Sequence, residues 1–306
     1  MLESLCLPII NYFAFMIAFK VNPYIEKLAS KSKTVRREFY PSLLENKKTA
    51  AIDPLEEDIN MPVPGLVHKY PNRVLILLTL NCSAYCRFCT RRRSVSDIKK
   101  GEITIADIKR MAVYIQKHSK INEVILSGGD PLTAPELLKQ ALKILGSLKQ
   151  IKIVRIGTRL PVSCPKGIDK TILNILKESP KQPLYLLVHF EHPDEITQET
   201  CQAIKKLRES GCILFSQTVF LRGVNDKVST LEKLFNELLA IGVKPYYIFH
   251  NDEPQGTEHF TVSFEKEAKI MDALRKRVGG LTCPVYVLDT AKAPYKIPLG
   301  YTKFKI

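Results

Sequence analysis

Three cysteines close together in the sequence give the chain its strongest chemical signal. Cys82, Cys86 and Cys89 have the spacing C-x3-C-x2-C. Thiolates are the usual ligands of iron–sulfur clusters, and a short loop can bind three irons of a cubane with them. The fourth iron then has no protein ligand and stays open to a small molecule. The spacing therefore predicts a [4Fe–4S] cluster with one open coordination site.

S-adenosylmethionine (SAM) can chelate such an open iron through its amino and carboxylate groups. One electron then cleaves a carbon–sulfur bond of SAM and gives a carbon radical. The alternative is a structural zinc site, which needs a fourth ligand and often two C-x2-C pairs. The sequence holds no second pair, which favours the cluster. A further segment suits the amino group of SAM, because glycine lets the backbone approach a ligand and a carboxylate binds an ammonium. It consists of Ser127, Gly128, Gly129 and Asp130.

Composition limits the partners and the compartment. The formal net charge of +15 would suit a nucleic acid, but the lysines are scattered over helical stretches that resemble solvent-exposed faces, so we expect no nucleic-acid partner. Eight cysteines in 306 residues do not form a secreted disulfide scaffold, and a redox-active cluster predicts the reducing cytoplasm. The apolar run 4–19 lacks a basic start and a cleavage site, which disfavours a signal peptide. It predicts a helix on the catalytic domain or at a dimer contact, with membrane association left open.

Short apolar runs alternate with amphipathic helical runs along the chain. Most starts of the apolar runs lie about thirty residues apart, as a parallel βα repeat requires. Thr133 and Glu136 predict a capping box, and Gly211 and Gly242 predict helix ends. The fold class is α/β: a partial (β/α)6 barrel, open on one side, with an N-terminal helical extension over 1–60 and a catalytic domain over 61–306. The predicted strands are 73–80, 123–127, 152–158, 184–190, 212–221 and 244–250.

Parallel barrels carry their chemistry at the C-terminal ends of the strands. The unusual polar residues of this chain lie at or near those ends, so we expect them to face one cavity. The cysteines and the SGGD segment follow the first two strands, and Arg159, His189, Gln217 and Asp252 lie at the next four. His189 and Gln217 could contact SAM there. For His189, a barrel histidine held by hydrogen bonds is an equal alternative.

Longer segments give the chain a specific resemblance between about Val21 and Pro298. They include DPLEED, VPGLVHKYPNRVL, CSAYCRFCTRRR, LSGGDPL, VRIGTRLPV, HFEHPDEIT, QTVFLRGVND, KPYYIFHND and VLDTAKAPYKIP. With these segments the sequence resembles the lysine 2,3-aminomutases, a family of radical SAM enzymes, and the similar enzymes that make β-lysine for elongation factor P. The resemblance implies a radical SAM barrel, pyridoxal 5′-phosphate (PLP) as a further cofactor, and an external electron donor.

The resemblance assigns three residues to PLP. Lys296 matches the lysine that forms the Schiff base, Arg73 matches an arginine that binds the phosphate, and Lys69 stands where a second phosphate-binding cation is found. A guanidinium suits phosphate, and a desolvated lysine amine can condense with an aldehyde. Zinc-bearing members of the family have a cysteine after GVND, where this chain has Lys227, and a cysteine-rich C-terminal segment. We therefore expect no zinc, and a homo-oligomer stays open.

Three further residues match those that bind the amino-acid substrate. Arg91 matches the arginine that pairs with the carboxylate, while Asp252 and Asp289 match two acids that bind the ε-ammonium of lysine. Each aspartate could instead cap a helix or a turn. Two acids around one buried ammonium reject substrates that lack this amine and favour lysine over glutamate.

The implied function is the interconversion of L-α-lysine and β-lysine through a SAM-derived radical and PLP. The alternatives are a radical SAM enzyme that acts on another amino acid or one that acts on RNA. PLP absorbance would distinguish the aminomutase from the RNA enzyme, in which the lysine-binding residues would have no role. If the chain belongs to the branch linked to elongation factor P, its product is (R)-β-lysine for the modification of that factor. One sequence leaves the destination of β-lysine open.

Overall fold

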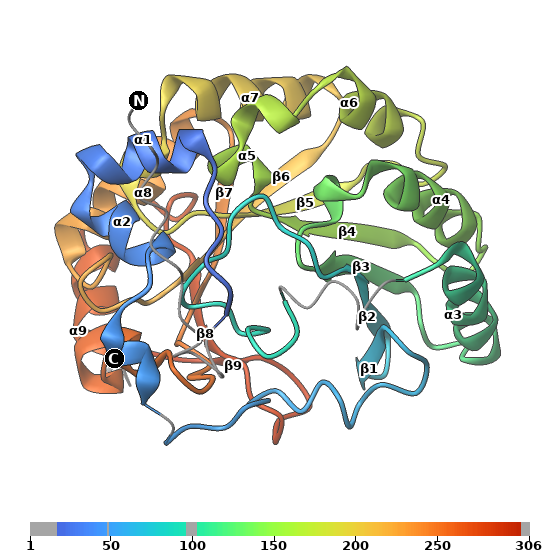
Figure 1. Ribbon diagram of the computed structural model, residues 1–306, viewed down its shortest axis with the longest axis horizontal. Helices are drawn as coiled ribbons and strands as arrows, with labels where there is room; N and C mark the ends of the chain where they lie inside the picture. Colours follow the sequence, from blue (N-terminus) through green and yellow to red (C-terminus); the bar gives the residue numbers. More distant parts are fainter. Residues whose placement is uncertain (1–16, 48, 96–102, 301–306) are drawn as a thin grey trace, which may run out of the picture.

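The computed structural model describes residues 17–47, 49–95 and 103–300. Its centre is a nine-stranded sheet whose strands follow one another in sequence order. The strands from β2 to β8 run parallel, and β1 and β9 pair antiparallel at the two edges. The sheet curves into a barrel that does not close (Figure 1). The strands are β1 (Leu66–Tyr70), β2 (Arg73–Thr79), β3 (Glu123–Gly128), β4 (Ile153–Thr158), β5 (Tyr185–His189), β6 (Ile213–Val219), β7 (Lys244–Phe249), β8 (Val285–Leu288) and β9 (Ile297–Pro298).

The six predicted strands correspond to β2 through β7, so the partial α/β barrel is confirmed. Three strands were not predicted. β8 is short and follows Pro284, while β1 and β9 are edge strands of five and two residues. The β8–β9 hairpin nevertheless carries part of the site, as shown below.

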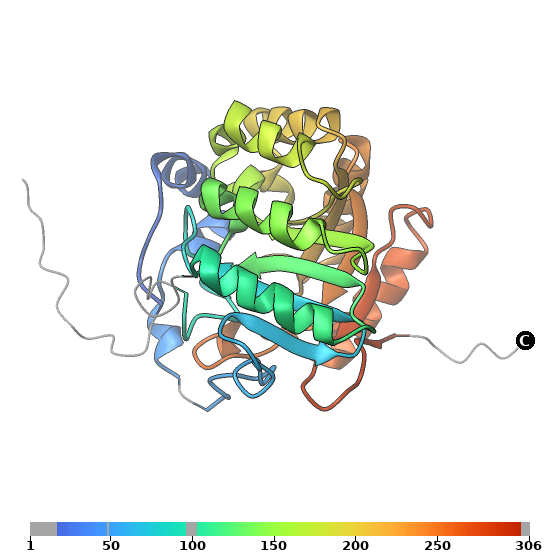
Figure 2. The same cartoon turned by 90° about the vertical axis from the view of Figure 1, so that its right-hand side faces the viewer.

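Helices cover the outer face of the curved sheet, and Figure 2 shows several of them stacked side by side there. Along β2, the side chains of Val74, Ile76 and Leu78 are buried against this helical layer. The residues between them face inward, because successive side chains of a strand point to opposite faces. The helices are α3 (Ile105–Lys117), α4 (Pro135–Gly146), α5 (Leu160–Ser163), α6 (Lys170–Lys177), α7 (Gln198–Glu209), α8 (Val228–Ala240) and α9 (Phe264–Arg275).

The predicted capping box before α4 is wrong. Thr133 ends the short 3-10 helix η3 (Pro131–Thr133), and its hydroxyl donates to the carbonyls of Asp130 and Asn81. The N-cap of α4 is Ala134, and no side chain among the described residues caps the helix. The predicted helix ends are confirmed, since Gly211 and Gly242 follow α7 and α8 with φ of +87° and +84°.

The N-terminal segment packs against the cysteine loop. It forms α1 (Pro23–Lys31), α2 (Lys33–Phe39) and the 3-10 helix η1 (Leu43–Asn46). Ile25 and Phe39 bury their side chains against Ala84, which lies between the first two cysteines of the motif. Most of the apolar run 4–19 lies outside the described residues. Among the helices of the described part, none is long and apolar enough to cross a membrane.

Candidate active site

A cavity of about 790 Å³ extends along the inside of the barrel. Its wall is built from the inward-facing residues of the strands and from the loops that follow them. All residues predicted for the site line this cavity. They are Cys82, Cys86, Cys89, Lys69, Arg73, Arg91, Ser127, Gly128, Gly129, Asp130, His189, Gln217, Asp252, Asp289 and Lys296.

The three cysteines lie in the loop after β2, at the C-terminal end of the parallel strands. Burial raises the pKa of all three thiols, and that of Cys86 to about 12. Thiolate ligation therefore needs a bound cation that displaces the protons. Among the described residues, no three His, Cys, Asp or Glu side chains converge on a single metal ion. A cubane does not need such convergence, because each thiolate binds a different iron. The sulfur donors thus fit a cluster.

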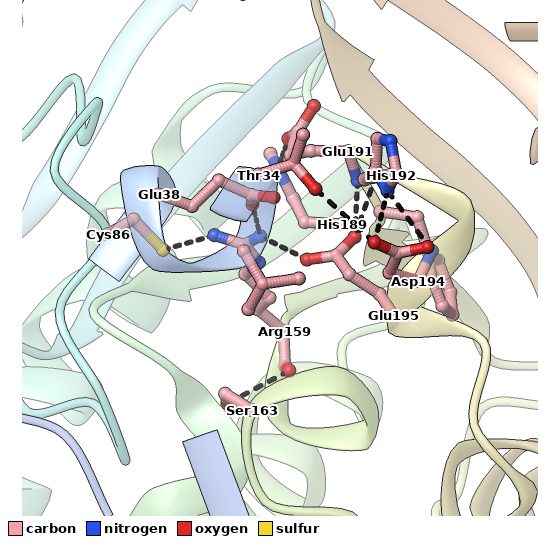
Figure 3. A network of polar contacts seen from close by, with 12 residues as sticks. Thr34, Glu38, Cys86, Arg159, Ser163, His189, Glu191, His192, Asp194 and Glu195 are labelled. Carbon is pink, nitrogen blue, oxygen red and sulfur yellow. Dashed lines mark hydrogen bonds and ion pairs between the residues drawn. The ribbon is translucent and has the colours of Figure 1, made fainter. Parts of the chain in front are cut away.

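Arg159 joins the cysteine loop to a group of buried acids (Figure 3). Its Nη1 donates to the sulfur of Cys86 at 2.7 Å, and its Nη2 donates to Glu38 of α2 and, at 2.5 Å, to Glu195. Burial raises the pKa of Glu38 well above its ordinary range, and the charge of Glu195 acts in the same direction. Arg159 lowers both the Glu38 and Cys86 pKa values. This network was not visible in the sequence, because its members lie far apart along the chain.

Gly128, the last residue of β3, and Gly129 lie against the backbone of another segment. A Cβ on Gly128 would lie 2.3 Å from the carbonyl oxygen of Thr79, and one on Gly129 would lie 2.2 Å from that of Asn81. Gly128 also has a φ of +113°. The close approach is therefore to the backbone that leads into the cysteine loop. It fixes this loop relative to β3.

The carboxylate of Asp130 has its hydrogen-bond partners within the protein. Its carboxylate accepts hydrogen bonds from the hydroxyl of Thr158 and from the backbone N–H groups of Leu132 and Arg159, at 2.8–3.1 Å. A carboxylate has about four acceptor sites, so these bonds fill most of its capacity. The geometry favours a positioning role, and binding of the SAM amino group by Asp130 stays a prediction.

His189 and Gln217 are register partners on β5 and β6 and face the same cavity. Nδ1 of His189 lies 3.7 Å from Oε1 of the buried Glu191. That distance is longer than a direct hydrogen bond, and a structural role for His189 beside the buried Glu191 remains the equal alternative. Contact of either residue with SAM remains a prediction.

The β8–β9 hairpin brings Asp289 and Lys296 together. Leu288 pairs with Ile297 in the antiparallel register, so Asp289 and Lys296 are the next pair along. Lys296 donates to Asp289 Oδ2, while Lys69 donates to Oδ1 at 2.9 Å and Tyr70 to the same oxygen at 3.1 Å. Burial lowers the pKa of Lys296, which Asp289 opposes. A larger fraction of neutral amine suits a lysine that must act as a nucleophile.

Asp252 faces the same group from the loop after β7. Its Oδ2 accepts a hydrogen bond from Thr90 at 3.1 Å, whereas Oδ1 is buried and has no hydrogen-bond partner among the described residues. Burial raises the pKa of Asp252 to about 6, the charge of Asp289 adds to this effect, and Lys296 opposes it. An unpaired buried carboxylate oxygen fits a site for a cationic ligand.

Two arginines line the cavity and differ in their partners. Arg73 begins β2, stacks 4.0 Å from the ring of Tyr70, and donates to the side chain of Asn72 at 3.3 Å. It fits an exposed anion such as a phosphate. Arg91, near the cysteines, binds Glu57 with three contacts of 2.7–3.1 Å. We did not foresee Glu57 as a site residue, although it belongs to the DPLEED segment.

Comparison with known proteins places these features in a family. Residues 76–238 match the model of the Radical SAM superfamily. The L-lysine 2,3-aminomutase of Clostridium subterminale is 41% identical over 87% of this chain and 64% of its own length. The L-lysine 2,3-aminomutase of Fusobacterium nucleatum is 36% identical over 97% of this chain and 68% of its own length. The chain thus spans about two thirds of these relatives.

Solved structures agree on the fold. A radical SAM methyltransferase from Sphaerobacter thermophilus superposes with a TM-score of 0.53 and 17% identity, over 73% of this chain and 68% of that one. Members of the superfamily hold a [4Fe–4S] cluster and SAM, which the donor set of the cysteine loop fits. The chain belongs to the radical SAM superfamily and, within it, to the family of the lysine 2,3-aminomutases.

Proposed function

We propose that this protein converts L-lysine to β-lysine by a radical mechanism that uses SAM and PLP. One observation carries the proposal: a single cavity is lined by a cation, Arg91, and by two acids, Asp252 and Asp289. This arrangement is complementary to an amino acid with a carboxylate at one end and an ammonium at the other. Lys296 lies beside the acids, where an amine could carry PLP.

The bound cofactors supply the hard chemistry: the cluster and SAM provide a carbon radical, and PLP provides a conjugated ring that stabilises an unpaired electron. The protein orients the reactants. Arg91 holds the carboxylate, Asp252 and Asp289 hold the ε-ammonium, and Arg73 with Lys69 offers positive charge to a phosphate. Lys296 supplies a partly buried amine of lowered pKa.

Anaerobic turnover tests the proposal directly. The protein is reconstituted with iron, sulfide and PLP, then given SAM, a strong reductant and isotope-labelled L-lysine, and the products are followed by NMR. We expect β-lysine. If 5′-deoxyadenosine forms without β-lysine, the radical SAM assignment stands and the lysine assignment is wrong, so other amino acids and then RNA become the substrates to test.

The destination of the product is a separate part of the proposal. The resemblance supports either free β-lysine or β-lysine for elongation factor P, and chiral analysis separates them because only the second branch requires (R)-β-lysine. We place the reaction in the reducing cytoplasm, since the thiols of the cysteine loop are free and a low-potential electron donor is required. Self-association in solution can be measured by light scattering on the reconstituted protein.

A further inference from the structure

The DPLEED segment, residues 53–58, forms a turn at the cavity. The N–H of Glu56 donates to the carbonyl of Asp53 at 3.2 Å, and that of Asp58 donates to the Asp53 carboxylate at 3.0 Å. Glu56 has a φ of +52°, a left-handed conformation that non-glycine residues adopt rarely and often near functional sites. The turn directs the next side chain, Glu57, inward, where it is 6% exposed.

Glu57 binds one edge of the Arg91 guanidinium. Nε lies 2.9 and 3.1 Å from the two carboxylate oxygens, and Nη2 lies 2.7 Å from Oε1. Both side chains are largely buried, at 7% and 13% exposure. Because two donors meet one carboxylate, the plane of the guanidinium is fixed as well as its position. The neighbouring Arg93 binds Asp53 and Asp58 and holds the same turn in place.

The other edge of Arg91 faces the cavity. Nη1 lies 3.4 Å from the hydroxyl of Ser127, and both residues line the cavity wall. A guanidinium has five N–H donors. Within the part of the chain that the structure describes, Glu57 and Ser127 account for Nε and for one N–H on each terminal nitrogen. One N–H on Nη1 and one on Nη2 remain, and together they match the two oxygens of a carboxylate.

We propose that Glu57 is a positioning residue, which holds Arg91 so that its terminal nitrogens bind the substrate carboxylate. The inference rests on the proposed function and deepens it, since it assigns the DPLEED turn a part in substrate recognition. Glu57 does not touch the substrate. Its effect on binding must therefore depend on the presence of a carboxylate in the ligand, which a general loss of structure would not produce.

The test compares two ligands on the reconstituted protein, under anaerobic conditions without reductant, by calorimetry. L-Lysine carries the carboxylate, and L-lysinamide carries a neutral amide in its place. For Glu57→Gln we expect L-lysine to bind about tenfold more weakly, the effect of losing one charged hydrogen bond, while binding of L-lysinamide changes less than about twofold. Two controls keep Glu57: Asp58→Asn in the same turn, which contacts Arg93, and Glu56→Gly, which relieves the left-handed residue. Both should retain the wild-type ratio of the two affinities.

Several results would overturn the inference. Equal weakening of both ligands in Glu57→Gln would mean that the residue is only structural. Tighter L-lysine binding would mean that Glu57 competes with the substrate for Arg91. If the wild-type protein binds no L-lysine, the proposed substrate is wrong and the inference falls with it. If the wild type binds L-lysine and the ratio does not change in Glu57→Gln, only the role of Glu57 is wrong.

Discussion

Asp252→Asn should make the protein more stable and a poorer binder of lysine. Burial and the charge of Asp289 raise the pKa of Asp252 from its ordinary value of 3.8 to about 6. One pKa unit corresponds to about 1.4 kcal/mol, so ionising this acid in the folded protein costs about 3 kcal/mol. Asparagine has the same shape, still offers an oxygen to Thr90 and carries no charge. The substitution removes the cost together with one partner of the ε-ammonium.

The pH dependence has a definite sign. The folded-state pKa lies above the ordinary value, so the folded protein binds the proton more tightly, and stability falls as the pH rises from 3.8 to about 6. The whole cost is present above pH 6. Asp252→Asn should therefore exceed the wild type by up to about 3 kcal/mol at pH 8, with a gain that shrinks toward zero near pH 4.

Urea unfolding of the PLP-free protein at the two pH values measures this gain, and calorimetry at pH 8 measures the loss of lysine affinity, about tenfold or more for one charge-assisted contact. Asp226→Asn is a control for which we expect the opposite change in stability. Hydrogen bonds from Lys266 and Gly223 lower the Asp226 pKa despite its burial, so this variant should lose stability at pH 8. The reasoning is refuted if Asp252→Asn is less stable than the wild type at pH 8, or if its gain is the same at both pH values.

Three further substitutions test other parts of the site. Lys296→Ala should abolish borohydride-trapped labelling of the chain by PLP, seen by mass spectrometry, while iron content is unchanged; labelling at the wild-type level would contradict the PLP assignment. Cys86→Ala should lose the visible absorbance of the cluster and all SAM cleavage, and a retained cluster would remove Cys86 from the ligand set. Arg159→Met should lower the free energy of unfolding by about 3–5 kcal/mol, because Glu38 and Glu195 stay buried without their cation; an unchanged unfolding midpoint would show that both acids are protonated.

The sequence predicted the inner strands well because they are largely apolar runs, most of which start about thirty residues apart. β8 was not predicted, because a strand of four residues that follows a proline is too short to show a clear hydrophobic pattern. The prediction of a capping box at Thr133 was wrong for a local reason. A 3-10 helix begins at Pro131, and the hydroxyl of Thr133 donates to the carbonyl of Asp130 in place of capping α4. Such competition between two short elements has no clear signature in one sequence.

The candidate site was predicted as a set of residues, but their contacts were not. Spacing and resemblance identified the cysteines, Arg91, Asp252 and Asp289. The sharing of Asp289 by Lys69 and Lys296 depends on the register of a hairpin that was not predicted. The pairing of Arg91 with Glu57 depends on the left-handed backbone of Glu56, a conformation that is more typical of glycine. Register and unusual backbone angles are set by tertiary structure, so one sequence does not reveal them.

The hairpin that carries Asp289 and Lys296 also limits how this enzyme can evolve. The two residues face the same cavity only because they are paired across the strands, with the six residues 290–295 between them. Substitutions within this connection keep the pairing, whereas an insertion or deletion of a single residue moves the following side chains to the opposite face. The segment is therefore free to vary in sequence but constrained in length. Lineages that change it should do so by exchange of residues or by insertions that leave the register of β9 intact.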